Sequence, residues 1–221
     1  VVAVKLKPVN LLVTPAGGAI CIGQSVNLDA AADLTGVPKT LGAEVAVTTG
    51  NASDANLGPN PLQNFYGGVK QQMLITAAEL SALGMTSGSR ISALSISLVT
   101  ANSSYTLQNL RIKMQHTALA TLSTFITAGW TTLRTPASYT PVTGWNLIGF
   151  DTGATFTWNG TSNLLVEINF SNANAGAGAP FNTACYDAAA ASAQTLLYRA
   201  DNQTAASLDT YSGAPSFTYN T

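Results

Sequence analysis

The sequence predicts an all-β fold: an antiparallel, jelly-roll-like β-sandwich with one short helix and an additional N-terminal strand segment. Three observations support this prediction. Nearly every apolar run alternates with a period of two, turn signals containing Gly, Asn or Pro separate the runs, and 221 residues are enough for one large β domain. Strands that place one face on a core and the other in a polar environment show this alternation.

The N-terminal part of the chain differs from the rest in its residue pattern and composition, and we expect it to form a separate segment over residues 1–43. Val2, Val4 and Leu6 alternate with small or basic residues before Pro8, which predicts a short strand. A second candidate strand covers residues 19–28, and residues 30–41 have the composition of a linker. The sandwich is then expected to span residues 44–221.

A short helix is predicted at about residues 76–83. Thr76 and Glu79 have the spacing of a capping box, in which each side chain bonds the backbone N–H of the other residue. Leu80 and Leu83 provide an apolar stripe, and Gly84 is suited to the C′ position.

The strands of the expected sandwich are assigned by their alternation. Arg111, Lys113 and Glu167 occupy the positions between apolar residues, so we expect them on the outward, polar faces of their strands. The predicted core residues lie on the opposite faces: Leu94, Ile96, Ile112, Met114, Ile148, Phe150, Val166, Ile168 and Phe170.

Composition excludes some classes of partner and leaves others open. Nine basic and ten acidic residues give a net charge of −1, which provides no electrostatic footprint for nucleic acid. No apolar run approaches the roughly 20 residues of a membrane span.

Cys21 and Cys185 either form one disulfide that closes a long loop or are two buried thiols. The absence of an initial Met is expected of a processed protein or of a segment of a longer one.

Two motif sets carry resemblances to known families. The first, Pro15-Ala16-Gly17-Gly18-Ala19-Ile20-Cys21-Ile22-Gly23-Gln24-Ser25-Val26-Asn27-Leu28, resembles the opening strands of Ig-like repeats in large secreted proteins of the Bacteroidetes. The Cys that usually pairs with this strand is absent, as is the rest of the repeat. This resemblance leads to the expectation that Cys21 is bonded to Cys185 instead.

The second resemblance covers about residues 45–221. Its motifs are Gln71–Leu80, Leu110–Thr117, Gly144-Trp145-Asn146, Phe156–Ile168 and Tyr198-Arg199-Ala200-Asp201. Together they resemble a jelly-roll-like module of Bacteroidetes cell-surface and secreted proteins, including gliding-motility adhesins and type IX secretion cargo. The resemblance implies an extracellular, non-catalytic structural or adhesive module, or the subunit of a self-assembling filament or stalk.

Candidate catalytic groups are few, so we expect no enzyme. His116 is the only histidine and is predicted to be a hydrogen-bonded structural residue; no Gly-x-Ser-x-Gly elbow accompanies it. The three glutamates show no pairing that indicates a glycosidase. No cofactor is expected, although loop residues could bind a structural calcium ion: Asp151, Asp187, Asp201, Asn202 and Asp209.

The partners expected are neighbouring copies, adjacent repeats or surface glycans. Val2, Val4 and Leu6 could add as a strand to the sheet edge of a neighbouring subunit, or dock within their own chain. The alternative function is a carbohydrate-binding module on a secreted hydrolase, with Tyr66, Trp130 and Tyr139 as the sugar-stacking platform. Trp145 and Trp158 belong to the family motifs and are expected to pack in the core.

Overall fold

The computed structural model describes residues 59–101, 105–176, 185 and 194–219, and the backbone of strands at 9–14, 29–33, 45–46 and 186–187. The chain divides into two compact units, residues 1–39 and residues 40–221, which we describe separately.

The first unit contains two antiparallel strands, β1 (Val9–Thr14) and β2 (Asp29–Asp33). Residues 30–41 were expected to be a linker, but residues 30–33 belong to β2, so that expectation is wrong at its start. The strands predicted at Val2 to Leu6 and at residues 19–28 lie outside the described residues.

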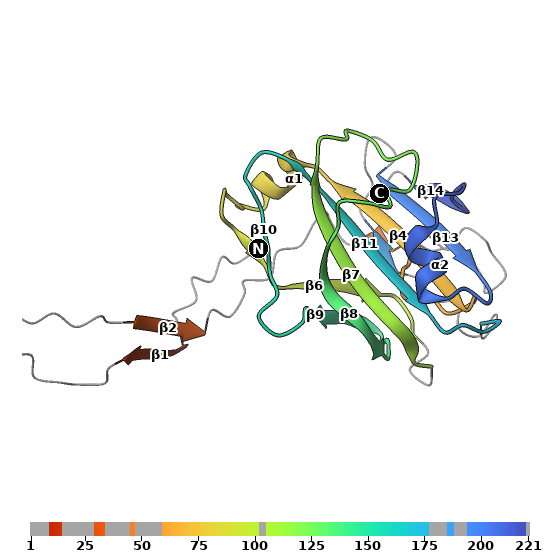
Figure 1. Cartoon of the computed structure of the whole chain (residues 1–221), viewed down its shortest axis with the longest axis horizontal. Coiled ribbons are helices and arrows are strands. Elements are labelled where there is room, and N and C mark those ends of the chain that lie inside the picture. The colour runs from red at the N-terminus through yellow and green to blue at the C-terminus, as the bar shows by residue number, and fades with distance from the viewer. Residues whose placement is uncertain are drawn as a thin grey trace, which may run out of the picture. The chain divides into compact units, whose positions relative to one another are not determined.

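The second unit is built on a six-stranded antiparallel sheet, which confirms the predicted all-β class (Figure 1). In spatial order its strands are β14 (Phe217–Tyr219), β13 (Thr195–Ala200), β4 (Gly68–Ile75), β11 (Asn163–Ser171), β7 (Leu107–Thr117) and β8 (Thr131–Tyr139). β11 lies at the centre and pairs along its length with β4 and β7.

Three shorter antiparallel pairs complete the described strands. They are β6 (Ala93–Leu98) with β9 (Gly144–Gly149), β5 (Arg90–Ile91) with β10 (Phe156–Thr157), and β3 (Val45–Ala46) with β12 (Tyr186–Asp187). β6 passes behind the long strands of the large sheet, so the unit is sandwich-like (Figure 1).

The main core fills the space between the large sheet and the β6–β9 pair. Of the predicted core residues, six are fully buried there: Ile112, Met114, Ile148, Val166, Ile168 and Phe170. Leu94, Ile96 and Phe150 are half-buried and pack against the same cluster. The periodicity therefore identified the apolar faces of β6, β7 and β11 correctly.

The predicted helix is present as α1 (Ala77–Ala82). Thr76 is its N-cap, the Thr76 hydroxyl accepts from the Glu79 N–H, and the Glu79 carboxylate accepts from the Thr76 N–H at 2.7 Å. Gly84 follows with φ of +77°, a conformation that glycine adopts without strain. Leu80 is buried in the main core and fixes this two-turn helix, which is too short to be stable alone.

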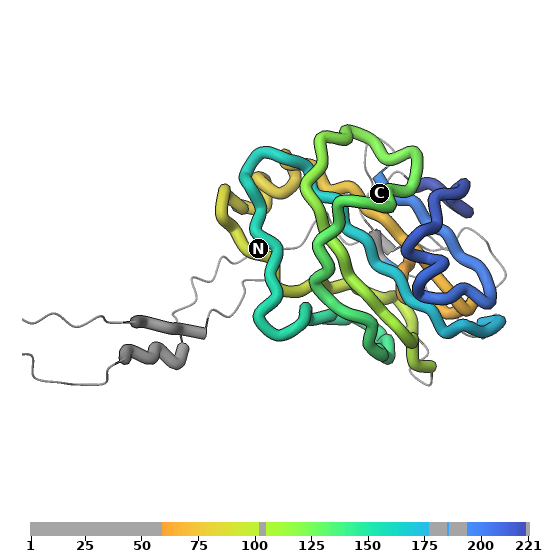
Figure 2. The backbone as a smooth tube through the Cα atoms, in the orientation of Figure 1, coloured from red at the N-terminus to blue at the C-terminus, as the bar shows by residue number. Residues whose placement is uncertain are grey.

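The second face of the large sheet is covered as well, which the alternation did not predict. A second helix, α2 (Ala205–Thr210), and the connection between β7 and β8 lie on the face opposite β6 (Figures 1 and 2). A second apolar cluster forms beneath them from Leu74, Leu122, Phe125, Leu165 and Leu196. Leu208 of α2 is also buried.

Candidate functional site

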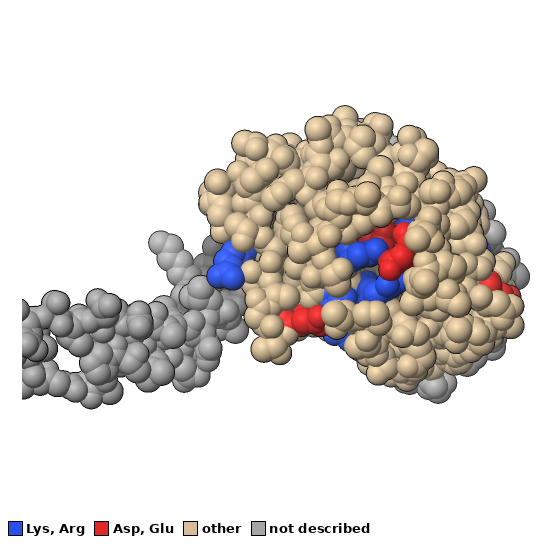
Figure 3. Space-filling view, in the orientation of Figure 1, with Lys and Arg blue, Asp and Glu red and all other residues tan. Residues whose placement is uncertain are grey.

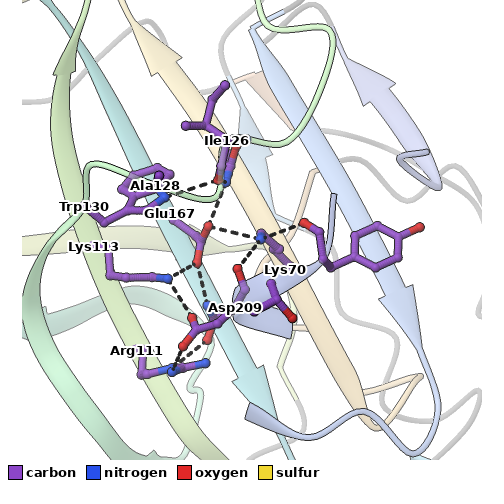
Figure 4. Close-up of polar contacts among 12 residues, drawn as sticks. Lys70, Arg111, Lys113, Ile126, Ala128, Trp130, Glu167 and Asp209 are labelled. Carbon is purple, nitrogen blue, oxygen red and sulfur yellow. Dashed lines mark hydrogen bonds and ion pairs between the residues drawn. The ribbon is translucent and has the colours of Figure 1, made fainter. Parts of the chain in front are cut away.

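Among the described residues, the candidate functional site is a group of five charged side chains that form ion pairs on this second face. We call Lys70, Arg111, Lys113, Glu167 and Asp209 the buried charge cluster (Figure 4). Strand register brings four of them together: Lys113 is paired with Glu167, while Asn169 stands between Arg111 and Lys70. Asp209 comes from α2.

Glu167 lies at the centre of the cluster and is completely buried. It was expected to face outward, and that expectation is wrong because α2 and the β7–β8 connection cover its face of the sheet. Oε1 of Glu167 accepts from Lys113 Nζ and Asn169 Nδ2, each at 2.7 Å. Oε2 accepts from Gln72 Nε2 at 2.7 Å and lies 3.5 Å from Lys70 Nζ. Both carboxylate oxygens are therefore surrounded by donors of the protein itself.

The cluster fastens α2 to the sheet. The Asp209 carboxylate is paired with Arg111 at 2.5 Å and with Lys113 at 2.6 Å. Arg111 also donates to the carbonyl of Ala205 at the first turn of α2. Lys70 Nζ donates to the carbonyls of Asp209 and Tyr211 at the helix end, where a cation also interacts favourably with the helix dipole. A six-residue helix needs such tertiary contacts to persist.

The same face holds the β7–β8 connection through Gln72. The Gln72 side chain donates to the carbonyl of Ile126 at 2.6 Å and accepts from the Ile126 N–H at 2.9 Å. The Trp130 indole N–H donates to the Ile126 carbonyl at 3.2 Å, and Lys113 Nζ lies 5.7 Å from the centre of the Trp130 ring. Gln72 therefore joins this connection to both the apolar and the charged parts of the face.

Burial and pairing change the proton affinities of two members of the cluster. Desolvation lowers the pKa of Lys70 from its usual value, although the charge of Glu167 acts in the opposite direction. Burial acts to raise the pKa of Asp209, but the hydrogen bonds and charges of Lys113 and Arg111 outweigh it and lower the pKa.

This arrangement is suited to holding structure together. Figure 3 shows charged groups at the base of a hollow in a face that is otherwise nearly free of charge. The Glu167 oxygens already accept from four donors, and the side chains of Lys70 and Glu167 have no exposed surface. A general acid or base must reach the proton that it transfers, and neither side chain can reach a bound substrate.

Each residue of the predicted sugar-stacking platform contacts different partners. Tyr66 packs against Phe65, and the Arg199 guanidinium lies 5.1 Å from its ring. Trp130 is half-buried beside Lys113, as described above. Tyr139 is half-buried at the edge of the main core, donates to Asn146 at 3.2 Å, and has its pKa raised by burial. These contacts orient the three rings individually.

Among the described residues, the large aromatic side chain that is exposed is instead Trp145, which was expected in the core. Trp158 is buried as expected, at 1% exposure, but Trp145 is 52% exposed and the expectation for it is wrong. On β9, Asn146 and Ile148 point inward, while Trp145 and Leu147 share the outer face. Leu147 is 69% exposed, and Val142 in the preceding turn is 46% exposed. Alternation on β9 reports two apolar faces, so the inward face could not be chosen from sequence.

The remaining polar candidates have structural contacts. His116 Nε2 accepts from the Asn159 N–H at 3.2 Å, and its ring packs 4.8 Å from Phe156, as a hydrogen-bonded structural histidine would. Asp151 accepts from the Thr135 N–H and Asp201 from the Gly67 N–H. Within the described residues, no group of three or more His, Cys, Asp or Glu side chains is placed to hold a metal ion.

Other predicted site residues are only partly described. Cys185 is buried, and its backbone forms an isolated antiparallel β-bridge with that of Leu98. Its Sγ lies 3.4 Å from the carbonyl oxygen of Pro59. Cys21 lies outside the described residues, so the Cys21–Cys185 bond stays a prediction. Val2, Val4 and Leu6 also lie outside the described residues, and Asp187 is described by its backbone alone.

The sequence reasoning missed the helix α2, because Asp209 was expected in a loop and lies in this helix instead, and it did not single out Lys70 of β4. The sequence Thr204-Ala205-Ala206-Ser207 is a capping box in the structure, with the Thr204 hydroxyl accepting from the Ser207 N–H and the Ser207 hydroxyl accepting from the Thr204 N–H. A Ser in place of Glu or Gln at the third helical position weakens this signal.

Comparison with known families, curated proteins and solved structures finds no match for this chain. Within the described part of the chain, no helix has the length and apolar character needed to cross a membrane.

Proposed function

We propose that this chain is a non-catalytic structural or adhesive module of a secreted cell-surface protein. The observation that carries the proposal is the state of the buried charge cluster. Its two carboxylates are engaged by Lys113 and by other donors of the protein, and they hold a helix in place. The charged side chains of the cluster are therefore paired inside the fold, while the surface seen in Figure 3 carries few charged side chains.

A surface of this kind suits close packing against other surfaces. Bringing two charge-poor surfaces together requires little desolvation of charge, which is the main cost of burying ionic groups. Three of the four large apolar residues that are exposed in the described part of the chain, Val142, Trp145 and Leu147, lie together in sequence at and just before β9, and the fourth is Leu119. An exposed apolar group of this kind is typical of interaction sites. The proposed partners are other copies, adjacent repeats of a longer chain, or surface glycans.

A second function, carbohydrate binding, is favoured by one specific observation. Trp145 presents more than half of its surface to solvent on a strand face, and an exposed indole can stack on the apolar face of a sugar ring. This proposal replaces Tyr66, Trp130 and Tyr139 with Trp145 as the leading aromatic contact.

An adhesion assay with the full chain tests the proposed function. Beads coated with the protein are scored for clustering with each other, for attachment to glycan arrays and for attachment to bacterial cells. Beads coated with the chain after thermal unfolding serve as the control. Specific attachment in any arm supports the proposal, with glycan attachment alone selecting the carbohydrate-binding function. Attachment in no arm, or turnover of polysaccharide substrates by the soluble chain, would contradict it.

A further inference from the structure

The β6–β9 pair ends in an edge strand, β9, to which a charged side chain of the described residues is bonded only at its Gly149 end. Among the described strands, β9 pairs only with β6. Residues 93–98 and 141–149 contain no charged residue, but Arg134 of β8 reaches one end of the outer edge of β9, where its Nη1 donates to the Gly149 carbonyl at 3.1 Å. Soluble proteins usually protect such edges with charged side chains or Pro, because an open edge is a template for pairing with another strand.

The direction of the open backbone groups follows from the ladder. Phe150 N–H donates to the Ser92 carbonyl at 3.2 Å, just beyond the end of the β6–β9 pair. In an antiparallel ladder the bonded positions alternate, so Asn146 and Ile148 direct their backbone groups toward β6. Trp145, Leu147 and Gly149 then direct theirs toward the other edge, and their side-chain positions share the exposed face of β9.

The sequence of β9 is complementary to itself when a second copy runs antiparallel. With Leu147 placed opposite Leu147 of the second copy, Trp145 stands opposite Gly149, and the outward backbone groups of Trp145 and Leu147 and the Gly149 N–H face backbone groups of the second copy. The Gly149 carbonyl already accepts from Arg134 Nη1 of its own chain at 3.1 Å, so it completes the ladder only by accepting a second hydrogen bond. A Cβ built at Gly149 would have nothing within 4 Å, so the space over Gly149 is open to an indole ring. Aromatic side chains packed over a cross-strand glycine are a known way of stabilising such pairs.

We infer that β9 is the contact through which two copies of this chain associate, by antiparallel β9–β9 pairing around a two-fold axis centred on Leu147. The inference rests on the proposed function and goes further by naming the strand, the register and the symmetry. A two-fold contact uses the same surface on both copies. The charged side chain bonded to this edge, Arg134 at Gly149, lies toward the ends of the pair and not on the axis at Leu147.

The contact is small, which sets its strength. Six residues of β9 with Val142 bury much less than the about 1,200 Å² at which stable interfaces begin. The pairing is therefore weak in dilute solution, and it becomes effective where copies are held at high local concentration, as on a common surface or in tandem repeats.

A charge-exchange experiment tests the register. Sedimentation equilibrium of the full chain, at concentrations that reach about 1 mM, measures self-association. Leu147→Lys and Leu147→Glu each place like charges at the centre of the pair, so each should weaken association at least about tenfold. An equimolar mixture of the two variants should restore it. Leu119→Lys, which changes an exposed leucine elsewhere, should leave association unchanged.

Three results would overturn the inference: a wild-type chain that is monomeric over the whole range, loss of association in the Leu119 variant as well, or no recovery in the mixture. A monomeric chain whose glycan binding disappears in Trp145→Ala would identify this face as a sugar-binding surface instead. Failure here leaves the proposed function standing if the coated beads still attach to cells or glycans. Failure of every bead arm would remove the proposed function itself.

Discussion

The two faces of the six-stranded sheet are both buried, yet they are built from opposite kinds of side chain. The face toward β6 and β9 carries residues such as Ile112, Val166 and Ile168. The face toward α2 carries Lys113, Glu167 and their neighbours. The difference shows that alternation reports the polarity of a strand face, whereas its exposure depends on what the rest of the chain places over it.

Polar side chains tolerate this burial because they satisfy each other. Each Glu167 oxygen has two donors nearby, and the three cations of the cluster contact carboxylate or carbonyl oxygens. A buried polar network is compatible with a stable fold only when its donors and acceptors are paired in this way. The two faces should therefore respond differently to substitution.

The largest effect is expected on the apolar face. Val166→Asp places a carboxylate among Met114, Met73 and other core side chains with no cation to pair it, so we expect a loss of about 4–5 kcal/mol of unfolding free energy or failure to fold. Urea unfolding monitored by tryptophan fluorescence measures it. Ala137→Asp, at an exposed position of β8, should cost less than about 1 kcal/mol. Similar stability of the two variants would show that the face of β11 is misassigned.

On the charged face, Glu167→Gln should cost about 3 kcal/mol, because Lys70 and Lys113 remain buried without their shared counter-charge. Chemical denaturation at neutral pH provides the measurement. The combined replacement Lys70→Met, Lys113→Met and Glu167→Leu removes the charges together, so it should cost less than the sum of the three single changes. Additive costs would mean that these side chains do not act as one network.

A smaller and pH-dependent effect is expected at Asp209. Its folded-state pKa is lowered, so the stabilisation from its ion pairs is fully present above the unfolded carboxyl pKa of about 3.9 and is lost as the pH falls through the lower folded value. Unfolding free energies of the wild type and Asp209→Asn should differ by about 1 kcal/mol at pH 7. The difference should disappear in strong acid, and a constant difference down to pH 2 would contradict this account.

The smallest effect is expected at the helix caps. Thr204→Ala removes the acceptor for the Ser207 N–H and should cost about 0.5–1 kcal/mol, and Thr76→Ala should cost a similar amount at α1. Amide hydrogen exchange in each helix is the measurement. Faster exchange in α2 after the Thr204 change, with α1 unaffected, would show that the helix on the charged face opens independently of the core.

The predictable part of the fold was the part that local pattern determines. The period of two identified β6, β7 and β11 and the apolar face of β11, and Thr76 with Glu79 identified α1. The covering of Glu167 could not be predicted, because α2 lies some 40 residues further along the chain and its Ser207 gives a weak capping signal. The prediction that Trp145 packs in the core was wrong for another reason. On β9 the pair Trp145 and Leu147 alternates with the pair Asn146 and Ile148, and the sequence alone does not decide which pair points inward.

The buried charge cluster has a consequence for how this protein responds to its medium. The chain has nineteen formally charged side chains, nine basic and ten acidic; four of them are buried in the cluster, where they are joined by the partly exposed Asp209. The exterior is left with even fewer charges than the composition implies, and dissolved salt acts mainly on exposed charges. Contacts made by this surface should therefore be nearly independent of ionic strength, from fresh water to sea water, because hydroxyl, amide and apolar groups make them.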